Sequence, residues 1–297
     1  MDASGRITES EQTMRIAFLG PEGTFSEVAA LQQAERDGGT LAPFSSIPAL
    51  VSAVETGLAD SAVLPIENSL EGSVSSTVDL LIHETKLKIR GELMIPVRHY
   101  LAVVPGTQLE DIKLLTSHTQ ALGQCRRFLD RCLPGVEQEA ALSTASAVAS
   151  VMEKKDPGRA AIGTRRAAEL YQAEILASDI QDNDNNVTRF IVLGRDDEQP
   201  TGRDKTSVCF SIKANVPGAL FECLEDLAEN RIQMTKLESR PMKTMIGAYY
   251  FLVDIEGHRS DPKVTETLDR LAEKCAMVKI FGSYPMDPSA PAYEGGD

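Results

Sequence analysis

The sequence predicts an α/β protein made of a larger domain and a smaller C-terminal domain, and three observations carry this prediction. Between residues 14 and 194, short apolar runs alternate with amphipathic segments, which favours a mostly parallel sheet with helices on both faces. Segment 195–204 is charged and contains proline and glycine, as expected of a linker. Beyond it, residues 205–285 follow the order βαββαβ, which is typical of a ferredoxin-like unit.

In the larger domain, the apolar runs have the length and composition of strands, and amphipathic segments follow most of them. We assign strands to residues 14–20, 41–46, 61–68, 88–104, 114–118, 159–163, 175–180 and 187–194. We assign helices to residues 25–35, 47–57, 73–83, 119–131, 144–154 and 164–172.

In the smaller domain, residues 205–213 alternate apolar and polar side chains, as a half-buried strand does. Further strands are predicted at 231–240, 248–257 and 278–285, with helices at 219–230 and 261–275. Residues 1–13 are polar and lack the apolar core of a secretory signal, so we expect a disordered leader there. Residues 286–297 form a tail that we also expect to be disordered.

The composition excludes several classes of protein. A net charge of −14 argues against nucleic acid or an anionic membrane as partner. No apolar stretch is long enough to predict a transmembrane helix. The five cysteines are odd in number and form no CxxC pair, which favours a cytoplasmic protein without disulfides or a zinc site.

Polar residues follow the predicted strands at the places where an open α/β sheet binds its ligands. These junctions are 20–26, 67–73, 117–120, 143–146 and 164–166. Helix N-termini favour anions, so junctions that converge would form a site for a small, multiply charged acid. Serine and threonine are also good N-caps, and for any single junction capping is the simpler explanation.

The segment 183–190 is the most unusual junction, because a run of Asn and Asp delivers Thr188 and Arg189 onto the start of an apolar strand. Arg189 there could pair with a carboxylate, and Thr188 could donate a hydrogen bond to a leaving oxygen. The alternative is that Arg189 is an ion-pair partner at the protein surface. His118 is the one histidine in a junction, and it has either a structural role or a role at the site.

Motifs of several enzyme classes are absent from the sequence: GxGxxG after a strand, GxxxxGK[ST], HExxH and GxSxG. No histidine has metal-ligand spacing, so we expect neither a metal nor a cofactor.

From Arg15 to Pro285 the chain resembles prephenate dehydratase with a C-terminal ACT regulatory domain. The matching segments are IAFLGPEGTFSEVAA (16–30), AVLPIENSLEGSV (62–74), SHTQALGQC (117–125), STASA (143–147), AAIGTRRAAELY (160–171), NVTRF (186–190), NVPGAL (215–220) and LESRP (237–241). One position departs from the family, since Thr119 stands where the family usually has proline. No helical chorismate mutase segment precedes Met14, so we expect a monofunctional enzyme.

The resemblance implies a catalytic domain over residues 14–194 whose fold is like that of type II periplasmic binding proteins. Lobe 1 is expected at about 14–87 and 178–194, and lobe 2 at about 88–177, with crossovers near 85–90 and 175–180. The implied reaction converts prephenate to phenylpyruvate, carbon dioxide and water without a cofactor. Thr188 would serve the departing hydroxyl, and Arg189 would neutralise a carboxylate.

The resemblance also implies the other site residues. Those expected at the substrate are Gly23, Thr24, Asn68, Ser69, Ser117, His118, Gln120, Thr144, Ser146, Asn186 and Phe190. Those expected at a phenylalanine effector site in the ACT domain are Asn215, Pro217, Gly218, Ala219, Leu220, Glu238, Ser239, Arg240 and Pro241, of which the last four could close the pocket from a second subunit. Pairing of ACT domains would give a homodimer or a homotetramer.

Two alternatives remain open from the sequence. The substrate could be arogenate, which carries an amine where prephenate has a ketone. The two-lobed fold also serves non-catalytic proteins that bind small anions, because a fold does not fix a function.

Overall fold

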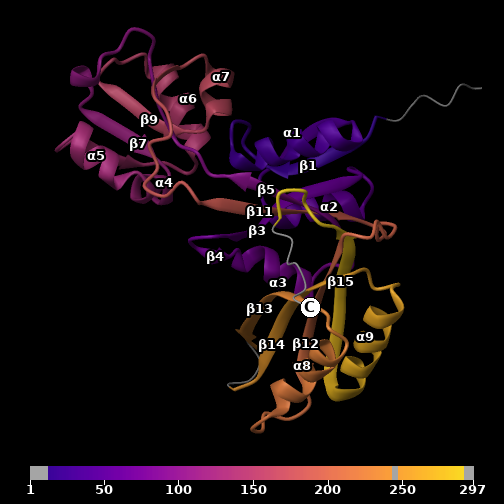
Figure 1. Ribbon diagram of the computed structural model, residues 1–297. Helices are drawn as coiled ribbons and strands as arrows, with labels where there is room; N and C mark the ends of the chain where they lie inside the picture. Colours follow the sequence, from indigo (N-terminus) through magenta and orange to yellow (C-terminus); the bar gives the residue numbers. More distant parts are fainter. Residues whose placement is uncertain (1–12, 243–246, 291–297) are drawn as a thin grey trace, which may run out of the picture.

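The computed structural model describes residues 13–242 and 247–290, which form three β-sheets flanked by helices (Figure 1). The predicted fold class is confirmed: two α/β lobes are followed by a C-terminal domain of ferredoxin-like order. No helix in these two ranges is long and apolar enough to cross a membrane.

The sheet of lobe 1 has the strand order β2-β1-β3-β11-β5, and β4 pairs with β3. Its strands are β1 (Arg15–Leu19), β2 (Thr40–Phe44), β3 (Ser61–Asn68), β4 (Gly72–Ser73), β5 (Lys88–Pro96) and β11 (Val187–Gly194). Helix α1 (Phe25–Asp37) packs on one face through a core that includes Phe18 and Phe190. Helices α2 (Ile47–Glu55) and α3 (Ser75–His83) cover the other face.

The sheet of lobe 2 has the strand order β10-β6-β9-β7-β8. Its elements are β6 (Tyr100–Val103), β7 (Leu114–Ser117), β8 (Glu137–Ala140), β9 (Arg159–Gly163), β10 (Glu174–Ala177), α4 (Thr119–Gln124), α5 (Arg126–Cys132), α6 (Thr144–Lys154), α7 (Arg165–Tyr171) and the 3-10 turn η1 (Leu109–Asp111). Helices α4 and α5 cover one face, and α6 and α7 cover the other.

The crossovers between the lobes differ from the prediction. Strand β5 pairs with β11 in lobe 1, so the first crossover lies at residues 97–99 and not near 85–90. The long apolar passage 88–104 therefore divides into two strands of different sheets. The returning segment runs beside the first crossover, where Val97 N–H donates to Asn186 O at 2.8 Å and Ile180 N–H donates to His99 O at 3.1 Å.

The C-terminal domain has the predicted order βαββαβ. Its elements are β12 (Asp204–Ile212), α8 (Ala219–Glu229), β13 (Met234–Pro241), β14 (Tyr249–Glu256), α9 (Pro262–Lys274) and β15 (Cys275–Pro285). The sheet order is β13-β14-β12-β15, and all of its pairings are antiparallel. Phe210 and Phe251 stack beneath the two helices at a centroid distance of 5.4 Å.

The other face of this third sheet packs on lobe 1. Cys209, Leu252, Phe281 and Tyr284 belong to the same core cluster as α2 and α3. The tail prediction is wrong for residues 286–290, because Asp287 is 3% exposed and forms an ion pair with Arg36 of α1 at 2.9 Å. Residues 1–12 and 291–297 of the predicted leader and tail lie outside the described residues.

Gly282 is required where β15 crosses β5. A Cβ at this position would lie 2.2 Å from the carbonyl oxygen of Ile89. We expect Gly282→Ala to lower the free energy of unfolding by about 1–3 kcal/mol, the usual effect of overpacking, as measured by urea denaturation. Gly123→Ala is the control, because nothing lies within 4 Å of a Cβ in this helical position. The control should gain about 0.5–1 kcal/mol from helix propensity; equal stability of the two variants would contradict the close approach.

Candidate functional site

Three loops of lobe 1 meet at one edge of its sheet. Strands β1 and β3 are parallel, so the loops that follow Leu19 and Asn68 leave the sheet on the same side. Strand β11 runs antiparallel to β3 and begins there, which places Thr188 directly opposite Asn68. The strand–helix junctions singled out in the sequence thus converge because of the strand order.

Asn68 is the centre of the polar contacts at this edge. Its Nδ2 donates to Asn186 Oδ1 at 2.8 Å and to Thr188 Oγ1 at 3.0 Å, and its Oδ1 accepts from the N–H groups of Leu70 and Glu71. Asn186 is 1% exposed, and its Nδ2 has no partner among the described atoms. A buried donor without a partner is uncommon in native proteins and is consistent with a group that meets a ligand.

The hydroxyl of Thr188 accepts a hydrogen bond from Asn68. Its own proton has no acceptor within the described part of the chain. A hydroxyl that accepts from a fixed amide keeps its donor capacity for a third group. Ser69 holds this arrangement in place, because its Oγ accepts from Val187 N–H at 3.0 Å and its N–H donates to Val187 O at 2.9 Å.

The predicted residues of lobe 2 gather at the corresponding edge of its sheet, but several of them have structural roles. Ser117 is fully buried and donates to Ile162 O at 2.7 Å. Ser146 belongs to the capping box of α6 with Ser143. His118 caps α4 by accepting from Gln120 N–H. The observed contacts of these three residues are therefore those of helix caps and of the core, as the simpler explanation of the junctions predicts.

In lobe 1, Thr24 is likewise an N-cap, of α1, where its Oγ1 accepts from Glu27 N–H at 3.3 Å.

The two edges touch through Gly23, whose φ of +85° favours glycine. A Cβ at Gly23 would lie 3.1 Å from Ala167 and 3.2 Å from Ala145, which lie in the first turns of α7 and α6. Thr164 Oγ1 donates to Gly23 O at 2.6 Å across the same contact. Gly23 therefore holds the N-termini of two lobe 2 helices against lobe 1.

A second contact between the lobes was not predicted from the sequence. Glu27 is 2% exposed, accepts from Gly23 N–H at 2.5 Å and binds Arg166 with both carboxylate oxygens, at 2.9 and 3.2 Å. The hydrogen bond with Glu27 raises the pKa of Arg166. Only the position of Glu27 three residues after an N-cap distinguishes it in the sequence, and that signal predicts a helix start.

The structure corrects the roles predicted for Arg189 and Phe190. Arg189 is 7% exposed and forms ion pairs with Glu67, with Glu92 and with Asp254 of the C-terminal domain, so it faces away from Thr188. Successive side chains of a strand point to opposite faces, which sends these two neighbours apart. Phe190 is 1% exposed and packs in the core beneath α1.

No group of three or more side chains that could hold a metal ion occurs among residues 13–242 and 247–290.

Comparison with known proteins decides the family. The family model of prephenate dehydratase matches residues 16–198. The chain is 40% identical to the prephenate dehydratase of Mycolicibacterium vanbaalenii, covering 94% of this chain and 97% of that protein. It is 42% identical to the bifunctional chorismate mutase/prephenate dehydratase of Neisseria gonorrhoeae, covering 93% of this chain and 75% of that protein. This chain belongs to the prephenate dehydratase family.

The solved structures agree with this assignment. The prephenate dehydratase of Arthrobacter aurescens, in complex with L-Phe, has a TM-score of 0.86 and 35% identity, and covers 94% of this chain and 92% of that chain. A protein described as a quorum quenching acylase has a TM-score of 0.82 and 34% identity over 92% of this chain and 98% of that chain. The fold alone therefore does not fix the reaction.

In this family member, a pocket of about 430 Å³ lies in the C-terminal domain between the start of α8 and the sheet. Its lining is Ile212, Asn215, Val216, Gly218, Leu220, Phe221, Ser239, Tyr249 and Phe251. Four of the predicted effector residues are among them: Asn215, Gly218, Leu220 and Ser239.

Glu238 and Arg240 point to the other face of β13. Glu238 accepts from Ser73, and Arg240 forms an ion pair with Asp79 of α3 at 2.9 Å. Within one chain both side chains therefore contact lobe 1 and do not line the pocket, because neighbouring residues of a strand face opposite ways; their predicted contact with the effector of a second subunit stays a prediction. Pro217, Ala219 and Pro241 do not line the pocket.

His99, at the first crossover, gives a prediction about pH. It is 2% exposed, its Nε2 contacts Gln124 Oε1 at 2.9 Å, and its ring packs edge-on to Phe25. Burial lowers the pKa of His99 from 6.5, against the opposing effect of the Gln124 hydrogen bond. The unfolded chain therefore takes up a proton near pH 6.5 that the folded protein binds only at lower pH.

The free energy of unfolding should therefore fall as the pH is lowered from about 6.5 toward the pKa of folded His99, and it should level off below that pKa, where both states carry the proton. His99→Gln should flatten this part of the curve, as measured by urea denaturation at a series of pH values from about 7.5 to about 5. An unchanged slope in the variant would show that His99 does not cause the loss of stability.

Proposed function

We propose that this member of the prephenate dehydratase family carries out its reaction between the facing edges of the two lobes. Residues 14–194 would supply the catalytic domain, and residues 205–285 would regulate it. The observation that carries the proposal is the Thr188 hydroxyl, which is held by Asn68 and keeps its proton for a ligand.

The reaction needs one proton and no electron carrier. The bond between the ring and its carboxylate breaks, and the carboxylate leaves as carbon dioxide. The electron pair shifts through the ring, which becomes aromatic, and the bond between the opposite ring carbon and its hydroxyl breaks. The departing hydroxyl takes up a proton and leaves as water.

We assign Thr188 to the departing hydroxyl. A threonine hydroxyl is too weakly acidic to be the final proton source, so it would polarise the leaving oxygen or relay a proton that comes from water. A donor placed where charge develops acts in the transition state more than in the ground state. Asn68, Ser69 and Asn186 would keep this donor in position.

The substrate carboxylates require positive potential that Arg189 does not supply. We place them at the edge of lobe 2, near the N-terminus of α6, whose free N–H groups favour anions. The side chains of Gln120 and Thr144 form no hydrogen bond within the described part of the chain, so both are available to a ligand. The carboxylate that leaves as neutral carbon dioxide must not be held too tightly, because that would stabilise the ground state.

We expect Thr188→Ala to lower kcat about 10²–10³-fold with a much smaller change in KM, the usual loss for a donor that acts in the transition state. Thr188→Ser is the matched control and should retain most of the activity, because it keeps the hydroxyl. The activity of both variants is measured as the release of phenylpyruvate from prephenate in the presence of a chelator. A parallel assay with arogenate tests which of the two substrates the enzyme prefers. Near-normal kcat in a folded Thr188→Ala protein would remove the assigned role.

We infer that L-phenylalanine binds in the C-terminal pocket and inhibits the enzyme. Apolar side chains such as Leu220 and Phe251 could receive the ring, while Asn215 and Ser239 offer polar groups to the amino-acid backbone. The A. aurescens relative was crystallised in complex with L-Phe, which is consistent with this assignment. Two apolar side chains of the pocket lining are exposed, Val216 at 57% and Phe221 at 68%, which fits the pairing of C-terminal domains in a dimer or tetramer.

Asn215→Ala should weaken phenylalanine binding about tenfold or more, because a hydrogen bond to a charged group typically contributes about 1.5–3 kcal/mol. Calorimetric titration of the full chain measures the affinity. Asn230→Ala, at the opposite end of α8, is the matched control and should bind normally. If both variants bind phenylalanine as the parent does, the effector site lies elsewhere.

A further inference from the structure

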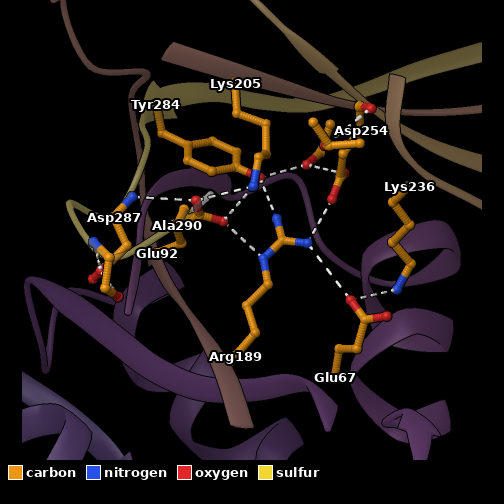
Figure 2. A network of polar contacts seen from close by, with 12 residues as sticks. Glu67, Glu92, Arg189, Lys205, Lys236, Asp254, Tyr284, Asp287 and Ala290 are labelled. Carbon is orange, nitrogen blue, oxygen red and sulfur yellow. Dashed lines mark hydrogen bonds and ion pairs between the residues drawn. The ribbon is translucent and has the colours of Figure 1, made fainter. Parts of the chain in front are cut away.

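Arg189 is held at the contact between lobe 1 and the C-terminal domain by hydrogen bonds to three groups and by an ion pair with Glu67 at 3.7 Å (Figure 2). Its Nε donates to Glu92 Oε2 at 2.8 Å, its Nη1 to Asp254 Oδ2 at 2.5 Å, and its Nη2 to Tyr284 OH at 2.8 Å. Glu92 lies on the neighbouring strand β5, whereas Asp254 and Tyr284 come from β14 and β15 of the C-terminal domain.

The groups around Arg189 form a closed ring of hydrogen bonds. Ser207 Oγ donates to Asp254 Oδ1 at 2.5 Å, so the proton between Ser207 and Tyr284, 2.6 Å apart, comes from the tyrosine. The ring therefore runs from Arg189 to Tyr284, to Ser207, to Asp254 and back to Arg189. A guanidinium with several fixed acceptors has little freedom to change its orientation.

The cluster is buried and balanced in charge. Lys205 Nζ lies 2.9 Å from Glu92 Oε2, so two cations and two carboxylates, Arg189 and Lys205 with Glu92 and Asp254, share one buried site. At its edge the half-buried Glu67 pairs with both Arg189 and Lys236, which keeps the charges balanced. Burial lowers the pKa of Arg189, but Asp254, Tyr284 and Glu92 raise it well above the usual value. Removing one member would leave a buried group without its partner, which is far more costly than losing an exposed ion pair.

Arg189 is bonded to Thr188 within β11, and the two side chains serve opposite faces of the strand. Behind Arg189 on the same face, Ile191 and Leu193 pack in the core cluster that contains Tyr284. Phe190 and Val192 pack on the α1 face. A bulge in the pairing with β3 lies between Arg189 and Phe190, and bulges set the direction of nearby side chains.

We propose that Asp254 and Tyr284 are positioning residues for the dehydration, which they serve by holding Arg189 and through it the Thr188 end of β11. The proposal rests on the function assigned above to Thr188. Neither residue would touch the substrate, so both act through the strand. The regulatory domain thus completes the catalytic one, and a shift of β14 and β15 relative to β5 displaces Thr188.

The physical reason is the sensitivity of catalysis to placement. A displacement of about 1 Å at a reacting group can lower a rate on the order of 10²-fold. The Thr188 hydroxyl has one observed partner, Asn68, so its position depends mainly on the backbone of β11. An effector that favours one arrangement of the C-terminal domain could then change the rate without reaching the substrate.

The test uses the full chain and two variants of the cluster. Tyr284→Phe removes one hydroxyl from the ring, and Asp254→Asn removes one charge with little change of shape. Lys279→Met is the matched control, because Lys279 also joins the two domains but does so through the carbonyl oxygens of Leu81, Ile82 and Thr85, none of which belongs to β11. Each protein is measured for kcat and KM with prephenate, for thermal stability, and for hydrogen exchange of the peptide containing residues 187–190.

We expect Tyr284→Phe to lower kcat about tenfold or more, the scale of one hydrogen bond to a charged group, with KM nearly unchanged. Exchange in residues 187–190 should become faster. Asp254→Asn should show both effects more strongly. Lys279→Met should lose thermal stability but keep kcat and the exchange pattern.

Normal kcat and normal exchange in Tyr284→Phe would overturn the proposal, as would an equal loss of kcat in Lys279→Met. If the parent protein does not turn over prephenate, the assigned function fails. Hydrogen exchange then still decides whether Tyr284 and Asp254 hold β11.

Discussion

The pleat of β11 is the constraint on which the rest of this structure depends. Because its side chains alternate between two faces, the strand presents Thr188 to Asn68 at the edge of the lobe 1 sheet and Arg189 to the C-terminal domain. The core beneath α1 and the core beneath α2 and α3 are also joined through it, since Phe190 belongs to one and Ile191 to the other. Any movement of this strand changes a site and a domain contact together.

The buried charges around Arg189 are better understood as a device for specificity than as a source of stability. Removing two cations and two carboxylates from water is costly, and a well-packed apolar cluster is often at least as stable. The ion pairs instead fix one orientation of the C-terminal domain, because a misplaced partner would leave a buried charge uncompensated. This role is a hypothesis. It is distinguished from a general packing role by comparing the stability of Tyr284→Phe, which changes the cluster, with that of Lys279→Met, which changes a different contact between the domains.

The contact between the lobes follows a different principle. Gly23 has no side chain, so the backbone of lobe 1 reaches the first turns of α6 and α7, where helix N–H groups favour anions. Glu27 and Arg166 add a charged contact at the edge of the same region. An acidic protein can in this way offer local positive potential to an anion without a free arginine at the reacting centre.

The sequence by itself determined the alternation of strands and helices, the change of order after residue 204, and the junctions that gather at the site. Local patterns suffice for these, because apolar periodicity and helix caps depend on near neighbours. The motif that contains Thr188 was also recognisable in the sequence, although its chemical role is still a prediction.

Only the tertiary structure decided which side of each strand a motif residue serves. Arg189, Glu238 and Arg240 stand inside recognisable motifs, yet each is turned toward the contact between the domains. Three further features could not be predicted from the sequence: the place of β5 in the lobe 1 sheet, the packing of residues 286–290 on lobe 1, and the ion pair of Glu27 with Arg166. These features depend on partners about 60 to 250 positions away in the chain, and a local pattern carries no information about such partners.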